Sequence, residues 1–234
     1  MRFAKRKTTP TTLRELAGVA KTVKELGPRE TIYSQGDVGK TVIYIQKGAV
    51  KLSAKTQGGK QAVVAVLGSG DFIGEKCLGG WSNRRLTATA IAPCTLVVIS
   101  KNEMSRVLRT RHSFCDVFFS YLLARNLRLE EDLIDNMCSS SEMRLARILL
   151  RLAEQGEQDE AHAFSEITQE TLARMIGTTR SRVNGFMKSF RKRGLITYTG
   201  KYDGNVRRND GLRVNADRLG ALLDKYLRPT IVGV

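Results

Sequence analysis

The pattern of hydrophobic residues changes near residue 100. Between residues 30 and 100, short apolar runs rich in Val, Ile and Thr are separated by glycine, as in TVIYIQKG and QAVVAVLGSGD. Within them Ile43 and Ile45, and later Val50 and Leu52, alternate with polar or amphipathic neighbours, as half-buried strands do. This rhythm of short strands and tight turns predicts a β-sandwich or barrel.

From Lys101 onward the apolar residues follow helical spacing. Residues 101–109 are predicted to form a short helix, and Ser113 is predicted to open a longer one that ends near Met137. Along this longer helix, apolar and amide side chains recur at alternating steps of three and four residues. This spacing is typical of the contact seam of a two-stranded coiled coil. The dimer-interface residues expected on this seam are Phe119, Leu122, Asn126, Leu129 and Leu133.

Two interpretations of this long helix remain open. The seam can face a second copy of the chain, with Asn126 fixing the register of the pair. Phe114, Phe118 and Leu123 would then form the flank that covers the β-domain. Alternatively, all these residues pack on the helix's own β-domain. Three serines at 139–141 interrupt the pattern, and Ser141 is predicted to cap a helix over residues 142–154.

The most specific signal is the segment from Ile167 to Tyr198. Thr168 is predicted to cap a short helix, Gly177 to end it, and Thr179 to cap a second helix that runs to about Lys192. The buried face of the first helix would be Leu172, Ala173 and Ile176; that of the second would be Val183, Phe186, Met187 and Phe190. This is a helix-turn-helix, with strands at 196–199 and 212–214 forming a wing and a final helix at 215–227.

The second of these helices has the properties of a DNA recognition helix. Its apolar face attaches it to the domain, and its outward polar side chains are long enough to reach base edges. Arg180 is the first choice for a two-pronged contact to guanine. The DNA-binding residues expected here are Thr168, Thr178, Thr179, Arg180, Ser181, Arg182, Asn184 and Lys188, where the threonines would contact phosphates.

Charge supports a polyanionic partner. The 234 residues include 39 Lys and Arg against 23 Asp and Glu, a formal net charge of +16. From Arg174 to Arg213 there are eleven basic residues and two acidic ones. A solvated basic surface or attraction to anionic lipid would explain the charge less specifically. Double-stranded DNA explains both its sign and its local concentration.

Composition excludes several other classes. No apolar run is long enough to cross a membrane, and the N-terminus has no apolar core of a secretory signal, which predicts a cytoplasmic protein. The four cysteines contain no CxxC pair, so no metal site is expected and the thiols are predicted to be reduced. The sequence shows no nucleophilic side chain paired with a general base. No catalytic residues are therefore assigned, and an enzyme is not expected.

At this point the chain resembles the Crp/Fnr superfamily of bacterial regulators over nearly its whole length. The resemblance is carried by the glycine-punctuated β-region, by GSGDFIGEKCLGGWSNRRLTATA, by the long helix and by TQETLARMIGTTRSRVNGFMKSFRKRGLI. It implies an α+β fold in three parts. These are a jelly-roll-like antiparallel β-roll effector domain at 1–110, a dimerisation helix at 111–138 and a winged helix-turn-helix domain at 139–234.

The resemblance also implies a ligand site. In this family GDFIGE begins the phosphate-binding cassette of a cyclic-nucleotide domain, so Glu75 would accept a hydrogen bond from the ribose 2′-hydroxyl and Arg84 would pair with the cyclic phosphate. Independently, Gly74 permits a close backbone approach, and the amides that follow it can face an anion. The ligand-binding residues expected are Gly74, Glu75, Lys76, Cys77, Arg84 and Arg85, with the amide of Leu78 beside them.

Two positions depart from cAMP-responsive members. Arg85 stands where they have a small hydroxyl residue, and Leu129 and Glu130 stand where they offer Thr and Ser to the adenine. Three interpretations of the pocket therefore stay open: a cyclic nucleotide (cAMP or cGMP) as effector, another small ligand, or a vestigial pocket. The expected partners are double-stranded DNA, a second copy of the chain and RNA polymerase.

The function expected is that of a transcription regulator that binds a pseudo-palindromic site as a homodimer, with allosteric control by a ligand in the β-roll. The alternative is a ligand-independent regulator or an architectural protein that binds DNA with little sequence preference.

Overall fold

The structure, a computed structural model, describes residues 16–59, 61–156, 167–198, 202–203, 206–207 and 212–227. Contacts divide the chain into two compact units, the first ending at Asp132 and the second beginning at Leu133. None of the helices in the described ranges is long and apolar enough to span a bilayer.

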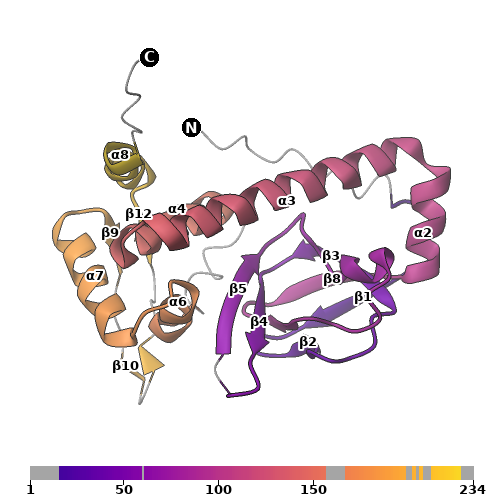
Figure 1. Cartoon of the computed structure of the whole chain (residues 1–234), viewed down its shortest axis with the longest axis horizontal. Coiled ribbons are helices and arrows are strands. Elements are labelled where there is room, and N and C mark those ends of the chain that lie inside the picture. Colours follow the sequence, from indigo (N-terminus) through magenta and orange to yellow (C-terminus); the bar gives the residue numbers. More distant parts are fainter. Residues whose placement is uncertain are drawn as a thin grey trace. The chain divides into compact units, whose positions relative to one another are not determined.

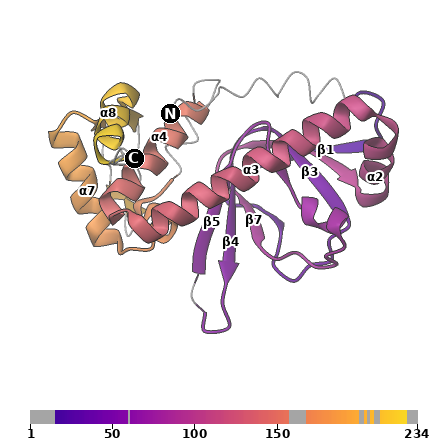
Figure 2. The same ribbon diagram turned by 45° about the horizontal axis from the view of Figure 1, so that its top comes forward.

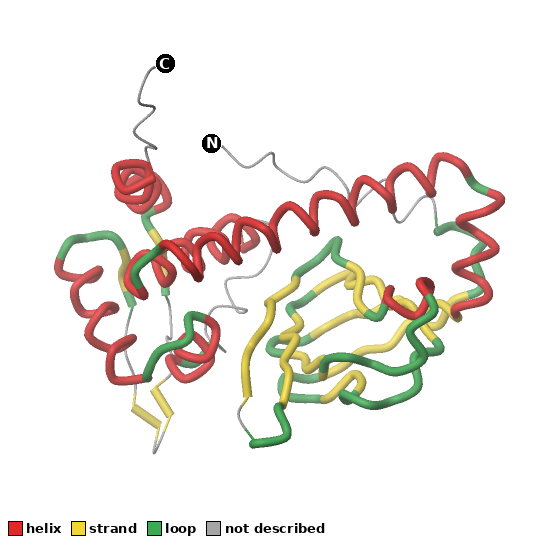
Figure 3. Tube along the Cα trace, viewed as in Figure 1, coloured by secondary structure: helices red, strands yellow, loops and turns green. Residues whose placement is uncertain are grey.

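The first unit contains two four-stranded antiparallel sheets, drawn as yellow strands in Figure 3. One has the order β1-β8-β3-β6 and the other β2-β7-β4-β5. The strands are β1 (Lys21–Leu26), β2 (Thr31–Tyr33), β3 (Thr41–Lys47), β4 (Val50–Lys55), β5 (Gln61–Leu67), β6 (Phe72–Ile73), β7 (Thr87–Ala90) and β8 (Cys94–Ser100). This confirms the predicted antiparallel β-domain.

Strand β3 is buried on both faces, which differs from the half-buried strand expected from the sequence. Ile43 and Ile45 pack in the cluster that also holds residues of β4 and β7. Val42 and Tyr44 point to the opposite face and pack with residues of the helices that follow the sheets. The sheet is therefore the middle layer of the unit, because both of its faces are covered by apolar groups.

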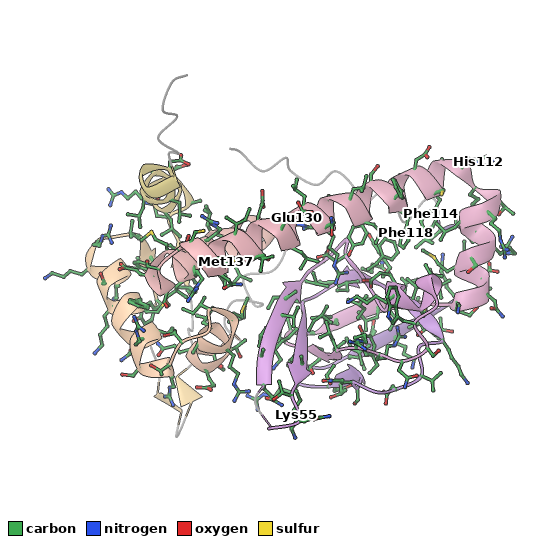
Figure 4. The ribbon with its side chains drawn as sticks, in the orientation of Figure 1. Lys55, His112, Phe114, Phe118, Glu130 and Met137 are labelled. Atoms are coloured by element: carbon green, nitrogen blue, oxygen red, sulfur yellow. The ribbon has the colours of Figure 1, made fainter. Side chains whose placement is uncertain are left out.

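Two helices cover the outer face of that sheet (Figure 1). Helix α2 (Lys101–Thr110) is capped by Ser100, whose hydroxyl accepts from the Glu103 amide at 3.2 Å. Helix α3 (His112–Cys138) begins one residue earlier than expected, so Ser113 lies within it. Figure 4 labels the buried Phe114 and Phe118 on the side of α3 that faces the sheet, as predicted.

The prediction for Leu123 is wrong. It does not cover the β-domain, because its side chain is 56% exposed. Leu122, expected on the outward seam, instead packs partly against the core of the first unit. Of the residues expected on the seam only Leu122 turns inward, whereas Phe119, Asn126, Leu129 and Leu133 are exposed.

The second unit contains mainly helices (Figure 2). They are α4 (Ser141–Gly156), α6 (Gln169–Met175), α7 (Arg180–Lys192) and α8 (Ala216–Leu227). The cap of α4 is Ser140 rather than the predicted Ser141, since the Ser140 hydroxyl accepts from the Met143 amide at 3.3 Å. Much of the polar stretch that follows α4 lies outside the described residues.

Short strands follow α7. Strand β9 (Ile196–Thr197) pairs with β12 (Arg213–Val214) in antiparallel register, which confirms the predicted pairing. A second hairpin, β10 (Tyr202–Asp203) with β11 (Val206–Arg207), lies between them and was not anticipated. Helix α8 begins after Asn215, whose side-chain oxygen accepts from the Arg218 amide.

Candidate functional site

A pocket in the first unit brings together all six residues expected at the ligand site. Its empty volume is about 380 Å³, including the opening to solvent. Strands β2 and β4, helix α3 and the 3-10 helix η1 (Glu75–Gly79) contribute to it. The lining residues are Tyr33, Gly39, Leu52, Gly74, Glu75, Lys76, Cys77, Trp81, Asn83, Arg84, Arg85, Leu86 and Arg125.

Arg84 is folded into the wall of this pocket. Its side chain donates to the backbone oxygen of Gly74 and to both the backbone and hydroxyl oxygens of Thr41, at 2.8 to 2.9 Å. The ring of Tyr33 covers its guanidinium, with 4.4 Å from Cζ to the ring centroid. The residue is only 8% exposed, and all of these partners are uncharged. Among the residues that the structure describes, no carboxylate pairs with Arg84, and a buried cation in this state favours an anionic ligand.

Gly74 is required for this placement of Arg84. It adopts φ +78°, and a Cβ there would lie 2.2 Å from Arg84 Nη1 and 2.9 Å from the Thr41 oxygen. No L side chain fits without moving one of these groups. The group that lies close to the Gly74 backbone in this structure is therefore the side chain of Arg84.

Glu75 is paired with an arginine from α3. Arg125 Nη1 lies 3.4 Å from its carboxylate, and the two side chains are only 14% and 12% exposed. The same Nη1 donates to the Phe72 oxygen at 2.8 Å and to the Tyr121 hydroxyl at 3.1 Å. Burial alone would lower the pKa of Arg125, but its interactions with Tyr121 and Glu75 outweigh this and raise it.

Tyr121 is the second link between α3 and the pocket. Its hydroxyl accepts from the Phe72 amide and donates to the Phe72 oxygen, both at 3.0 Å. Burial, followed by the charge of Asp71, raises its pKa. Burial and the nearby carboxylate of Glu75 also raise the pKa of Tyr33, to about 12. Both phenols are therefore neutral near pH 7.

The backbone amides do not all face the pocket as expected. The Cys77 amide donates to the Gly74 oxygen at 3.4 Å, which closes the turn of η1. Burial also raises the pKa of the Cys77 thiol, so this group is neutral and packs in the core. Lys76 and Arg85 do line the pocket, and both are exposed at its opening.

The groups that hold Arg84, Glu75 and the wall of the pocket in place were not predicted from the sequence; they are Tyr33, Thr41, Tyr121 and Arg125. Tyr33 and Thr41 lie at least 43 residues before Arg84, and no local spacing connects them to it. Arg125 offered a weak signal, because it is a cation on the side of α3 that carries Phe114, Phe118 and Tyr121.

In the second unit the helix-turn-helix has the predicted caps. The Thr168 hydroxyl accepts from the Thr171 amide at 3.1 Å, and the Thr179 hydroxyl accepts from the Arg182 amide at 3.4 Å. Gly177 turns the chain between α6 and α7 with φ +64°. Thr178, also expected at DNA, is half-buried in this turn, and its amide donates to the Ala173 oxygen.

The two faces of α7 differ as a recognition helix requires. Val183, Met187 and Phe190 are fully buried, whereas Phe186 is half-buried beneath Arg182, whose Cζ lies 5.9 Å from the ring centroid. Among the residues expected at DNA, Ser181, Arg182 and Lys188 are exposed, and Arg180 and Asn184 are partly exposed.

An apolar row is exposed along α3. Phe119 is 60% exposed, and the row continues at steps of four, four, seven and three residues. Its members are Phe119, Leu123, Leu127, Ile134 and Met137, with Leu129 and Leu133 exposed beside it. Asn126, on the predicted seam, donates to Glu130 of its own helix at 3.0 Å. Leu127, Ile134 and Met137 are exposed apolar residues of α3 that the expected seam did not include.

Comparisons with known proteins agree with this arrangement. Residues 23–111 match the family model of the cyclic nucleotide-binding domain, and residues 143–213 match that of the Crp-like helix-turn-helix domain. The first match contains the pocket cassette, and the second contains α6 and α7.

Similar proteins of known function include transcription regulators. The chain is 26% identical over 195 residues to the CRP-like cAMP-activated global transcriptional regulator of Mycobacterium tuberculosis, which covers 80% of this chain and 87% of that one. It is 27% identical over 178 residues to the cAMP-activated global transcriptional regulator CRP of Salmonella typhimurium, with coverages of 74% and 84%.

Solved structures share the fold. FixK2 from Bradyrhizobium japonicum superposes with a TM-score of 0.72 at 16% identity, over 87% of this chain and 98% of that one. The c-di-GMP responsive regulator CLP of Xanthomonas campestris gives a TM-score of 0.65 at 20% identity, over 86% and 99%. With a cyclic nucleotide-binding domain, a long helix and a Crp-like helix-turn-helix in this order, the chain belongs to the Crp/Fnr family of transcription regulators.

Proposed function

We propose that this regulator binds a pseudo-palindromic DNA site as a homodimer, with one α7 in each half-site. The observation that carries the proposal is the division of α7 into a buried face and a basic outward face. Its buried face, Val183, Met187 and Phe190, holds the helix in place. The partly exposed Arg180 and the exposed Arg182 and Lys188 are then available for base edges and phosphates.

The dimer is supported by the exposed row on α3. Five apolar side chains at helical spacing, from Phe119 to Met137, are each at least 56% exposed. A row of this length is costly to leave in water, and a second copy of the same helix would cover it. The predicted parts, 1–110, 111–138 and 139–234, then act as effector domain, dimerisation helix and reading head.

We also propose that the pocket in the β-roll binds a nucleotide-type effector. The two relatives named above are described as cAMP-activated, and the site here keeps a buried arginine beside a glycine turn. An effector phosphate that took over the donors of Arg84 would release Thr41 and the Gly74 carbonyl. Contact with RNA polymerase is part of the proposal, as for a regulator that acts on transcription.

Footprinting of the full chain on genomic fragments tests the DNA part. We expect protection of two half-sites about one helical turn apart, roughly 34 Å, related by two-fold symmetry. A single asymmetric half-site would overturn the dimeric proposal. Equal affinity for random and selected DNA would favour an architectural role instead, which the net charge of +16 would also support.

A further inference from the structure

Four cationic side chains and one carboxylate share the pocket of the first unit. The cations are Lys76, Arg84, Arg85 and Arg125, and the carboxylate is Glu75. Since Glu75 is paired with Arg125 at 3.4 Å, that pair is neutral as a unit. Three positive charges of the lining are therefore left without a carboxylate among the described residues.

These three charges occupy two different places. Arg84 is 8% exposed and lies in the wall, where its partners are the uncharged oxygens of Gly74 and Thr41. Lys76 and Arg85 are exposed at the opening. Their side chains form no ion pair with any residue that the structure describes. The pocket thus has an inner cationic position and an outer one.

An exposed tryptophan lines the same pocket as the outer cations. Trp81 is 58% exposed and lines the same pocket. Its ring lies against Gly79, where a Cβ would come within 3.1 Å of Trp81 Cζ3. A flat aromatic surface next to cations is suited to stacking a nucleobase whose phosphate is held nearby.

We infer that the effector of this pocket carries at least two phosphate charges, one for Arg84 and one for Lys76 with Arg85, and a purine that stacks on Trp81. This rests on the proposed effector role of the pocket. A cyclic mononucleotide has a single negative charge, which Arg84 alone would match, and the charges of Lys76 and Arg85 would then have no ligand phosphate to pair with. Exposed cations are common on a chain of net charge +16, but these two share one pocket with a buried arginine.

Two kinds of ligand share this chemistry: a cyclic dinucleotide, with two separated phosphodiesters, and a nucleoside diphosphate, with two adjacent phosphates. Calorimetric titration of the full-length protein with cAMP, cyclic di-AMP and ADP separates them while the base stays adenine. A second charged hydrogen bond corresponds to a factor of about ten or more in affinity. We expect cyclic di-AMP or ADP to bind at least about tenfold more tightly than cAMP.

The variant Lys76→Ala/Arg85→Ala tests the outer position. Both side chains are exposed, so the fold does not depend on them. Most of the tenfold preference should disappear in this variant, because the affinity for cAMP should fall much less than the affinity for the ligands with two phosphate charges. The charge-matched control Lys24→Ala/Lys47→Ala removes two exposed strand lysines outside the pocket and should keep the preference.

Three results would contradict the inference. If cAMP binds as tightly as the two other ligands, the effector class is wrong, but the proposed effector pocket stands. If the outer variant and its control behave alike, the preference comes from net charge and the outer position is overturned. If none of the three ligands binds, the proposed effector pocket falls together with the inference, whereas DNA binding is measured separately by footprinting.

Discussion

The guanidinium of Arg125 lies 3.4 Å from the carboxylate of Glu75 and so ties helix α3 to the wall of the pocket. The same guanidinium holds the Phe72 carbonyl, and Tyr121, one helical turn earlier, holds both polar groups of the Phe72 backbone. A ligand that contacts Glu75 would therefore act on the residues that attach α3 to the β-domain. This offers a physical route from the pocket to the helix that carries the exposed apolar row.

Arg125→Ala should destabilise the first unit. The substitution leaves the Glu75 carboxylate, which is only 12% exposed, without its partner, at a cost of about 2 to 4 kcal/mol. Urea unfolding followed by circular dichroism measures the change. Adding Glu75→Gln to this variant should recover part of the loss, because the unpaired charge is gone. If Arg125→Ala is no more destabilising than Arg109→Ala, an exposed change on α2, the pair is not structural.

Gly74→Ala should be more harmful than the same change at Gly59. Both glycines have nearly the same φ, +78° and +77°, so the backbone strain is similar, about 1 kcal/mol. At Gly59 a Cβ would meet nothing within 4 Å, whereas at Gly74 it would displace Arg84. We expect a loss of unfolding free energy of at least about 3 kcal/mol for Gly74→Ala. Equal losses in thermal unfolding would show that Arg84 can move without cost.

Arg180→Ala and Lys188→Ala should affect DNA binding in different ways. Loss of a two-pronged contact to guanine should reduce discrimination between the specific site and a mutated site by about 1 to 3 kcal/mol. Loss of a phosphate contact at Lys188 should weaken binding to all sequences and lower the salt slope by about one. Fluorescence anisotropy at several salt concentrations distinguishes the two. If Arg180→Ala weakens binding to the specific site and to the mutated site equally, Arg180 does not recognise a base.

Leu127→Asp should dissociate the proposed dimer. Leu127 is 57% exposed in the middle of the apolar row, and a carboxylate buried at a helix interface without a partner is strongly unfavourable. Sedimentation velocity at micromolar concentration should show monomers for this variant and dimers for the parent chain. Ala124→Asp, at an exposed position of α3 outside the row, serves as the control. A Leu127→Asp protein that remains dimeric would place the interface elsewhere.

The stability of the first unit should depend on Glu103 in acid. Hydrogen bonds from Arg106, at 2.8 and 2.7 Å, and from the Ala20 amide, at 3.2 Å, lower the pKa of this carboxyl to about 2. Because the folded pKa lies below the usual 4.5, the contribution is complete above that value and is lost as pH falls from about 4.5 to 2. Unfolding curves of Glu103→Gln should lack this part of the acid dependence. If Glu103→Gln instead lowers the free energy of unfolding by the same amount at every pH, ionisation of Glu103 is not the source of the acid dependence.

Local features were predictable where the interaction spans a few residues. The caps of α6 and α7 were correctly placed, because a threonine hydroxyl reaches an amide three residues ahead in the same chain. At the start of α4 two adjacent serines could fill this role. The choice of Ser140 over Ser141 depends on where the first turn begins, which the composition does not specify.

The sequence by itself determined the order of β-domain, long helix and helix-turn-helix, because hydrophobic periodicity and capping are local properties of the chain. Only the tertiary structure decided which side of α3 faces the core, and that Arg84 binds Thr41 while Glu75 binds Arg125. Those contacts join groups 43 and 50 residues apart. Folding of the β-domain brings Thr41 of β3 to Arg84, and packing of α3 on the sheet brings Arg125 to Glu75. No spacing along the chain encodes either distance.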